Sequence, residues 1–137
     1  MNLLKDLNSK ILVDLLYLIT FSIAAFQKVS GLKVPSWFLK QFENSILNLF
    51  DGSLHIQFII ISLLELYIAV LALVSLLKNK TKNSLQANYL KLASICFIIL
   101  ALGQRLTFKF DQAAYLFFYA VISIFLLKSL EGKSERQ

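Results

Sequence analysis

Four long apolar runs, separated by short polar segments, dominate the chain. They cover residues 11–29, 54–77, 85–104 and 113–130. A helix of about 20 residues crosses the ~30 Å of hydrocarbon in a bilayer. The pattern therefore predicts an all-α, integral membrane four-helix bundle, with residues 1–137 forming a single membrane domain.

Two of these runs carry features that complicate the pattern. Lys5 and Lys10 precede the first run and "SIAA" lies near its end, which is also typical of a cleaved signal peptide. We expect the run to be retained as a span. Lys91 lies inside the third run, where its side chain is expected to snorkel to the headgroups.

The segment between the first two runs predicts an amphipathic helix over residues 35–50. Pro35 suits a first helical position and Gly52 lies beyond a plausible end. The apolar residues fall at helical spacing: Phe38, Phe42, Ile46, Leu49 and Phe50. We expect this helix, with Trp37, to lie at the outer interface or over the mouth of the bundle. A re-entrant hairpin or a soluble cap is the alternative.

Composition agrees with a membrane protein and narrows the possible partners. The 137 residues are 58% hydrophobic and 16% charged, whereas soluble domains are about 45–50% apolar and about 25% charged. The net charge of +6 does not indicate nucleic-acid binding, because the lysines sit at the ends of apolar runs. One Cys and one His exclude a disulfide framework and a multi-thiol or multi-imidazole metal site.

The cations are unevenly divided between the two sides that four spans define. Nine of the 14 Lys and Arg fall on the side of both termini: Lys5, Lys10, Lys78, Lys80, Lys82, Lys91, Lys128, Lys133 and Arg136. The other five fall on the opposite side: Lys28, Lys33, Lys40, Arg105 and Lys109. By the positive-inside rule, both termini are predicted in the cytoplasm and the protein in the cytoplasmic (inner) membrane.

Glu65 is the most informative polar residue, because it is near the middle of the second run. A charge there costs ~3 kcal/mol on insertion scales, so it must be paired, protonated or facing protein or water. Ser62, Ala69 and Ala72 share its helical face, and small residues favour close helix packing. Its neighbourhood is predicted to include residues at the outer ends of the other spans: Lys28, Gln104, Arg105, Asp111, Tyr115 and Tyr119.

These residues predict a polar pocket open to the outer side, beneath the amphipathic helix. Arg105 is the preferred partner of Glu65, with Lys28 as the second choice. A purely structural ion-pair cluster that sets helix register is the alternative. For Arg105, Lys109 and Asp111, ordinary solvated charges of the outer turn are the favoured interpretation.

Three other candidate residues are interpreted as structural. Asp14 is expected near the headgroups, paired with Lys10. Cys96 is expected to be a packing residue. His55 stands alone, which does not indicate a metal site.

Several motifs together resemble the DoxX-like family of membrane proteins. They are "FQKVSGLK", "WFLKQF", "LLELYIAVLALVSLL" and "GQRLTFKFDQAAYLFFYAV", and the resemblance covers residues 11–128. Position by position, the resemblance includes Lys28, Glu65, Gln104 and Arg105. The chain departs from the family where Ala69 and Ala72 replace the glycines common after the acid of the second helix.

The resemblance implies a four-helix membrane protein that serves as an accessory or small subunit of a redox- or sulfur-metabolism complex. It implies a redox or sulfur-transfer protein partner and a quinone as a candidate ligand. An autonomous enzyme is not expected, because Cys96 has no second thiol and no Ser–His pairing is visible in the sequence. The alternative is a small transporter or channel-like protein, a homo-oligomer that uses Glu65 as its coupling group.

Overall fold

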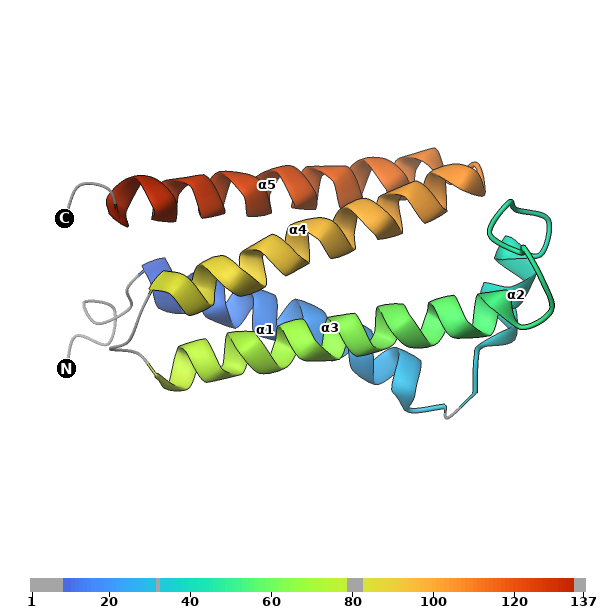
Figure 1. The fold of residues 1–137 in the computed structure, drawn as a ribbon, viewed down its shortest axis with the longest axis horizontal. Coiled ribbons are helices and arrows are strands. Elements are labelled where there is room, and N and C mark those ends of the chain that lie inside the picture. The colour runs from blue at the N-terminus through green and yellow to red at the C-terminus, as the bar shows by residue number, and fades with distance from the viewer. Residues whose placement is uncertain (1–8, 32, 79–82, 135–137) are drawn as a thin grey trace.

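The long helices, four in the described residues, run back and forth along one axis (Figure 1). The structure, a computed structural model, describes residues 9–31, 33–78 and 83–134. The long helices are α1 (Ser9–Val29), α3 (Ser53–Leu77), α4 (Asn83–Leu106) and α5 (Phe110–Ser134). All four are long and apolar enough to cross a membrane. The predicted integral membrane four-helix bundle is confirmed, with helices that extend slightly beyond the predicted runs.

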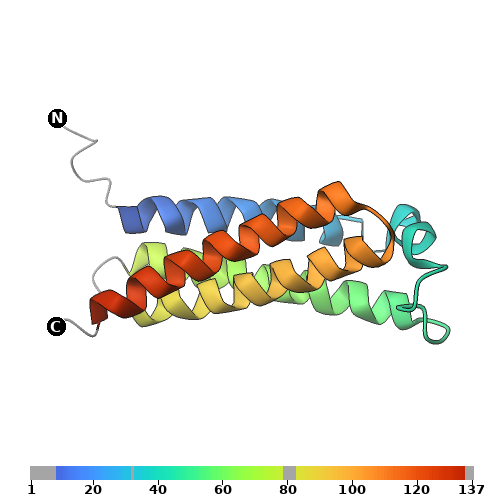
Figure 2. The ribbon, with the colours of Figure 1, turned by 90° about the horizontal axis from the view of Figure 1, so that it is seen from above.

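The helices pack in chain order around one core. α1 packs along α3, α3 along α4, and α4 along α5. The free ends of α1 and α5 lie at one end of the bundle and the short helix α2 (Ser36–Phe42) lies at the other (Figures 1 and 2). Of the cations counted for topology, Lys5, Lys80, Lys82 and Arg136 lie outside the described residues.

Small side chains let the helices approach closely in the core, and large ones fill the space between them. Ala69 and Ala72 are buried, as the small-residue stripe beside Glu65 predicted, and Ala93 on α4 and Ala120 on α5 are buried as well. The larger members of the core include the following: Tyr17, Phe21, Ile68, Tyr89, Leu90, Cys96 and Phe97. Cys96 is therefore a packing residue, as expected.

The outward faces of the long helices are apolar, as contact with lipid requires. On α1 the exposed apolar residues recur every three or four positions: Leu12, Leu16, Ile19, Ile23 and Phe26. A soluble bundle would place polar residues there. The chain is thus an integral membrane protein. Lys91 is exposed and forms an ion pair with Glu131, with 3.4 Å between Nζ and Oε1.

The amphipathic helix is shorter than the predicted range 35–50, because α2 ends at Phe42. Ser45 Oγ donates a hydrogen bond to the Phe42 carbonyl at 2.7 Å, and Asn48 Nδ2 donates to the Glu43 carbonyl at 3.0 Å. Side chains of this kind compete with the helical backbone for its hydrogen bonds. Residues 43–52 consequently form turns, and Ile46, Leu49 and Phe50 are exposed.

α2 is held at the end of the bundle by a small aromatic cluster. Phe38 and Phe42 are buried against Leu54 and Phe58 at the start of α3. The ring centroids of Phe38 and Phe58 are 4.9 Å apart. The part of the predicted helix that packs as expected is therefore its first two turns.

Candidate functional site

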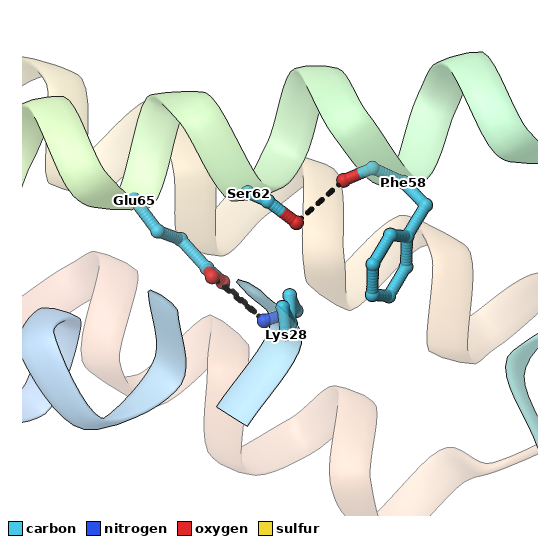
Figure 3. A network of polar contacts seen from close by, with 4 residues as sticks. All are labelled: Lys28, Phe58, Ser62 and Glu65. Atoms are coloured by element: carbon cyan, nitrogen blue, oxygen red, sulfur yellow. Dashed lines mark hydrogen bonds and ion pairs between the residues drawn. The ribbon is translucent and has the colours of Figure 1, made fainter. Parts of the chain in front are cut away.

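An ion pair between Lys28 and Glu65 lies inside the bundle (Figure 3). Glu65 is the thirteenth of the 25 residues of α3, and its side chain is 2% exposed. Lys28 Nζ donates to Glu65 Oε1 at 2.8 Å and to Oε2 at 2.7 Å. The Lys28 side chain, 18% exposed, points from the end of α1 toward the carboxylate.

The geometry of this pair lowers the cost of placing two charges in the membrane. Each charge alone would be expensive to desolvate, and two charge-assisted hydrogen bonds offset part of that cost. Ser62, one turn away on α3, donates to the Phe58 carbonyl at 2.7 Å and stays within its own helix (Figure 3). Because Lys28 belongs to α1 and Glu65 to α3, the ion pair joins these two helices and does not involve the end of α4.

A cavity of about 530 Å³ lies beside the ion pair, toward α2. Most of its wall is apolar, and the polar exceptions are Lys28, Gln57 and Gln104. The apolar lining comes from α2, α3, α4, α5 and the loop after α2: Trp37, Phe38, Phe42, Leu47, Phe58, Ile60, Ile61, Leu64, Ile99, Leu100, Leu102, Leu106 and Leu116. The expected pocket under the amphipathic helix is present, but it is largely apolar.

The cavity can be reached from the lipid. Ile60 on α3, Leu102 on α4 and Trp37 on α2 line it, and each is more than half exposed. Leu64, next in sequence to Glu65, also lines the cavity. The cavity thus has both exposed, lipid-facing residues and Lys28, the partner of Glu65, in its wall.

Gln104 connects the cavity to the turn between α4 and α5. Gln41 Nε2 donates to Gln104 Oε1 at 2.9 Å and to Thr107 Oγ1 at 3.2 Å. Lys109 Nζ in turn donates to Gln41 Oε1 at 2.9 Å. This chain of hydrogen bonds joins α2 to the α4–α5 turn and holds α2 over the cavity.

The other predicted site residues are not at the cavity. Arg105 is exposed and its guanidinium carbon lies 4.6 Å from the centroid of the Phe110 ring, so the expectation that Arg105 is the partner of Glu65 is corrected. Asp111 is exposed in the first turn of α5. Tyr115 is exposed, and Tyr119 packs on the Phe97 ring at 5.6 Å between centroids.

A buried polar network lies at the other end of the bundle, where the sequence pattern predicted only an Asp14–Lys10 pair. Asp14 Oδ1 accepts hydrogen bonds from Tyr89 at 2.5 Å and Gln86 Nε2 at 3.0 Å, and Oδ2 accepts one from Ser75 at 3.0 Å. The predicted pairing with Lys10 is corrected, because these three donors come from α3 and α4. In the sequence, the only indication of this network is that two polar residues, Gln86 and Tyr89, lie three positions apart and so share one helical face.

The site shows no arrangement of metal ligands. Among residues 9–31, 33–78 and 83–134, no group of three or more His, Cys, Asp or Glu side chains lies close enough to hold a metal ion. The chemistry that the cavity can offer is therefore hydrophobic binding with a few hydrogen-bond donors, of which the Lys28 ammonium is the strongest.

Comparisons of the chain with protein-family models, with curated proteins and with solved structures found no match. The resemblance to DoxX-like proteins therefore stays a prediction. The geometry of the cavity and of the Lys28–Glu65 pair is the basis for a functional hypothesis.

Proposed function

We propose that this chain is an accessory membrane subunit of a redox- or sulfur-metabolism complex that binds a quinone in the cavity beside Lys28. The observation that carries the proposal is the cavity of about 530 Å³ with its apolar wall and its single ammonium group. Ligand sites typically have volumes of about 300–1,000 Å³, with apolar walls and a few polar groups. The size and the lining both fit a quinone ring with the first part of its tail.

Lys28 is suited to orient the ring of such a ligand. An ammonium group has three donors, and two of those on Lys28 are used by Glu65 in the hydrogen bonds among the described residues. The third can donate to a quinone carbonyl oxygen, while Glu65 keeps the ammonium in place. The rings of Phe42 and Phe58 line the cavity and offer apolar surface to the quinone ring.

The lipid-facing rim gives the tail a way out of the cavity. Ile60 and Leu102 are exposed apolar residues at this rim. An isoprenoid tail that passed between them would remain in the hydrocarbon. A bound quinone supplies two-electron carrier chemistry, and the electrons would come from a redox or sulfur-transfer protein partner.

Quinone binding can be measured with Trp37, which lines the cavity and is the single Trp of the chain. A short-chain quinone titrated into the detergent-solubilised protein should quench its fluorescence saturably. Because a hydrogen bond to a charged group contributes about 1.5–3 kcal/mol, the Lys28→Met/Glu65→Met double change should weaken binding about tenfold or more. The matched control is Lys91→Met/Glu131→Met, which removes the exposed ion pair on α4 and α5. Unsaturable quenching, or equal affinity in both double variants, contradicts quinone binding at this site.

The accessory role needs its own experiment. Any redox or sulfur-transfer protein that is found encoded beside the gene for this chain should reduce quinone faster when the two proteins are reconstituted together. The Ile61→Phe change, which places a larger side chain in the cavity wall, should remove that gain. An equal rate with and without the chain rejects the subunit role, even if quinone binding is observed.

The alternative function is an oligomeric transporter or channel-like protein that uses Glu65 as its coupling group. Its support is the position of Glu65 at the centre of α3. It predicts that ion flux into proteoliposomes is lost in Glu65→Gln. Flux that is unchanged by this substitution rejects the alternative.

A further inference from the structure

A second hollow lies at the α2 end of the bundle, next to the cavity but with a different lining. It has a volume of about 470 Å³ and is formed by α2 and the α4–α5 turn. Five residues line it: Trp37, Lys40, Gln41, Thr107 and Lys109. Two are cationic and none is acidic, so the hollow favours an anion.

The cationic side of the hollow is partly ordered by hydrogen bonds. Lys109 Nζ donates to Gln41 Oε1 at 2.9 Å, and Gln41 is itself held by Thr107 Oγ1 and Gln104 Oε1. An ammonium has three donors, so Lys109 can bind an anion without releasing Gln41. Lys40 projects from α2 as an exposed side chain and adds a second positive charge.

The position of the hollow indicates which anion it meets. It lies where α4 ends and α5 begins, at the level where spanning helices leave the hydrocarbon. Phe108 and Phe110, which flank Lys109, are 80% and 49% exposed. Trp37 is 56% exposed and lines both the hollow and the apolar cavity. Tryptophan beside lysine is typical of the headgroup level of a membrane protein.

We propose that this hollow binds the phosphate of an anionic phospholipid headgroup between Lys40 and Lys109, with the acyl chains left in the bilayer beside Phe108 and Phe110. Lysine binds phosphate as a compact charge with several donors. One phosphate held by both lysines would connect α2 to the α4–α5 turn. The site is separate from the proposed quinone site and does not depend on it.

The test uses the fluorescence of Trp37 in the full chain in detergent. Short-chain phosphatidylglycerol should give a saturable change, and phosphatidylcholine and inorganic phosphate should bind much more weakly. At about 1 kcal/mol for each lysine near an anionic lipid, Lys40→Gln/Lys109→Gln should weaken binding about 30-fold. Lys33→Gln removes an exposed cation before α2 that does not line the hollow, and should leave the affinity unchanged.

Two further variants distinguish the site from a fold defect and from the cavity. Lys40→Arg/Lys109→Arg keeps both charges and should retain most of the affinity for phosphatidylglycerol. Ile61→Phe fills part of the cavity and should leave the affinity for phosphatidylglycerol unchanged. Equal binding of phosphatidylcholine, tight binding of inorganic phosphate, or an equal loss in Lys33→Gln overturns the proposal. So does a loss of affinity in Ile61→Phe, because the lipid would then occupy the cavity.

Discussion

Lys28, the next-to-last residue of α1, donates to both carboxylate oxygens of Glu65, the central residue of α3. The lysine stem runs back from the helix end and places the ammonium at the depth of the acid, as long basic side chains can do. A lysine in the last turn of one helix can therefore neutralise a charge in the middle of the neighbouring helix. The pair joins two spans and borders the cavity at the same time.

The first prediction concerns the strength of this pair. Lys28→Met and Glu65→Gln should each destabilise the protein by about 3–5 kcal/mol, because each leaves a buried partner uncompensated. The double variant should lose less than the two single losses added together. The free energy of unfolding in mixed micelles measures these effects. The exposed Lys91–Glu131 pair, with both side chains 54% exposed, is the control and should show little change and little coupling.

The second prediction separates Arg105 from this pair. Arg105→Gln should have a small effect on stability, because the exposed guanidinium stacks on the Phe110 ring at 4.6 Å. Its effect should add to that of Glu65→Gln, since no contact joins the two residues. A coupling free energy above ~1 kcal/mol between Arg105 and Glu65 would contradict the observed pairing.

The third prediction concerns the buried carboxylate at the opposite end of the bundle. Asp14→Ala leaves three buried donors without their acceptor, and should cost about 2–4 kcal/mol. Adding Tyr89→Phe removes one of those donors, so the double variant should lose less than the sum. Ser94→Ala is the control, because the buried Ser94 hydroxyl donates to the Leu90 carbonyl of its own helix at 2.8 Å and, among the described residues, to no neighbouring helix. Additive losses at Asp14 and Tyr89 would show that the network does not act as a unit.

The fourth prediction uses the turn between α4 and α5. Phe108 has a φ of 61°, and the Lys109 amide donates to the Gln104 carbonyl at 2.9 Å, an arrangement that glycine usually occupies at a helix end. Phe108→Gly should therefore raise the free energy of unfolding by about 1 kcal/mol. Phe125→Gly, at an exposed position inside α5, should lower it by about 1 kcal/mol. A loss of stability in both variants would mean that contacts of the Phe108 ring outweigh its backbone strain.

The fifth prediction is the orientation of the chain. The nine-to-five division of cations predicts that both chain ends lie in the cytoplasm. Reporter fusions after Gln137 and at Asn83 should both give cytoplasmic signals. A periplasmic signal at either position rejects the orientation.

The sequence by itself determined the number, the approximate bounds and the class of the long helices. Runs of about 20 apolar residues form helices in lipid, because a helix satisfies all of its backbone hydrogen bonds internally. It also determined that Glu65 must be paired or shielded, since exposing a charge to hydrocarbon is costly at any orientation. The small-residue face of α3 indicated where close packing would occur.

Which groups meet across the bundle was decided by the tertiary structure. Lys28 and Arg105 are both cations near the predicted outer end, and only the length and placement of α1 against α3 brings Lys28 to Glu65. The hydrogen bond from Tyr89 on α4 to Asp14 on α1 depends on how the two helices are rotated and aligned along their axes. The sequence pattern does not determine that rotation and alignment. The early end of α2 at Phe42 has a local cause instead, because the Ser45 hydroxyl donates to the Phe42 carbonyl, a backbone acceptor that the amphipathic pattern had assigned to the helix.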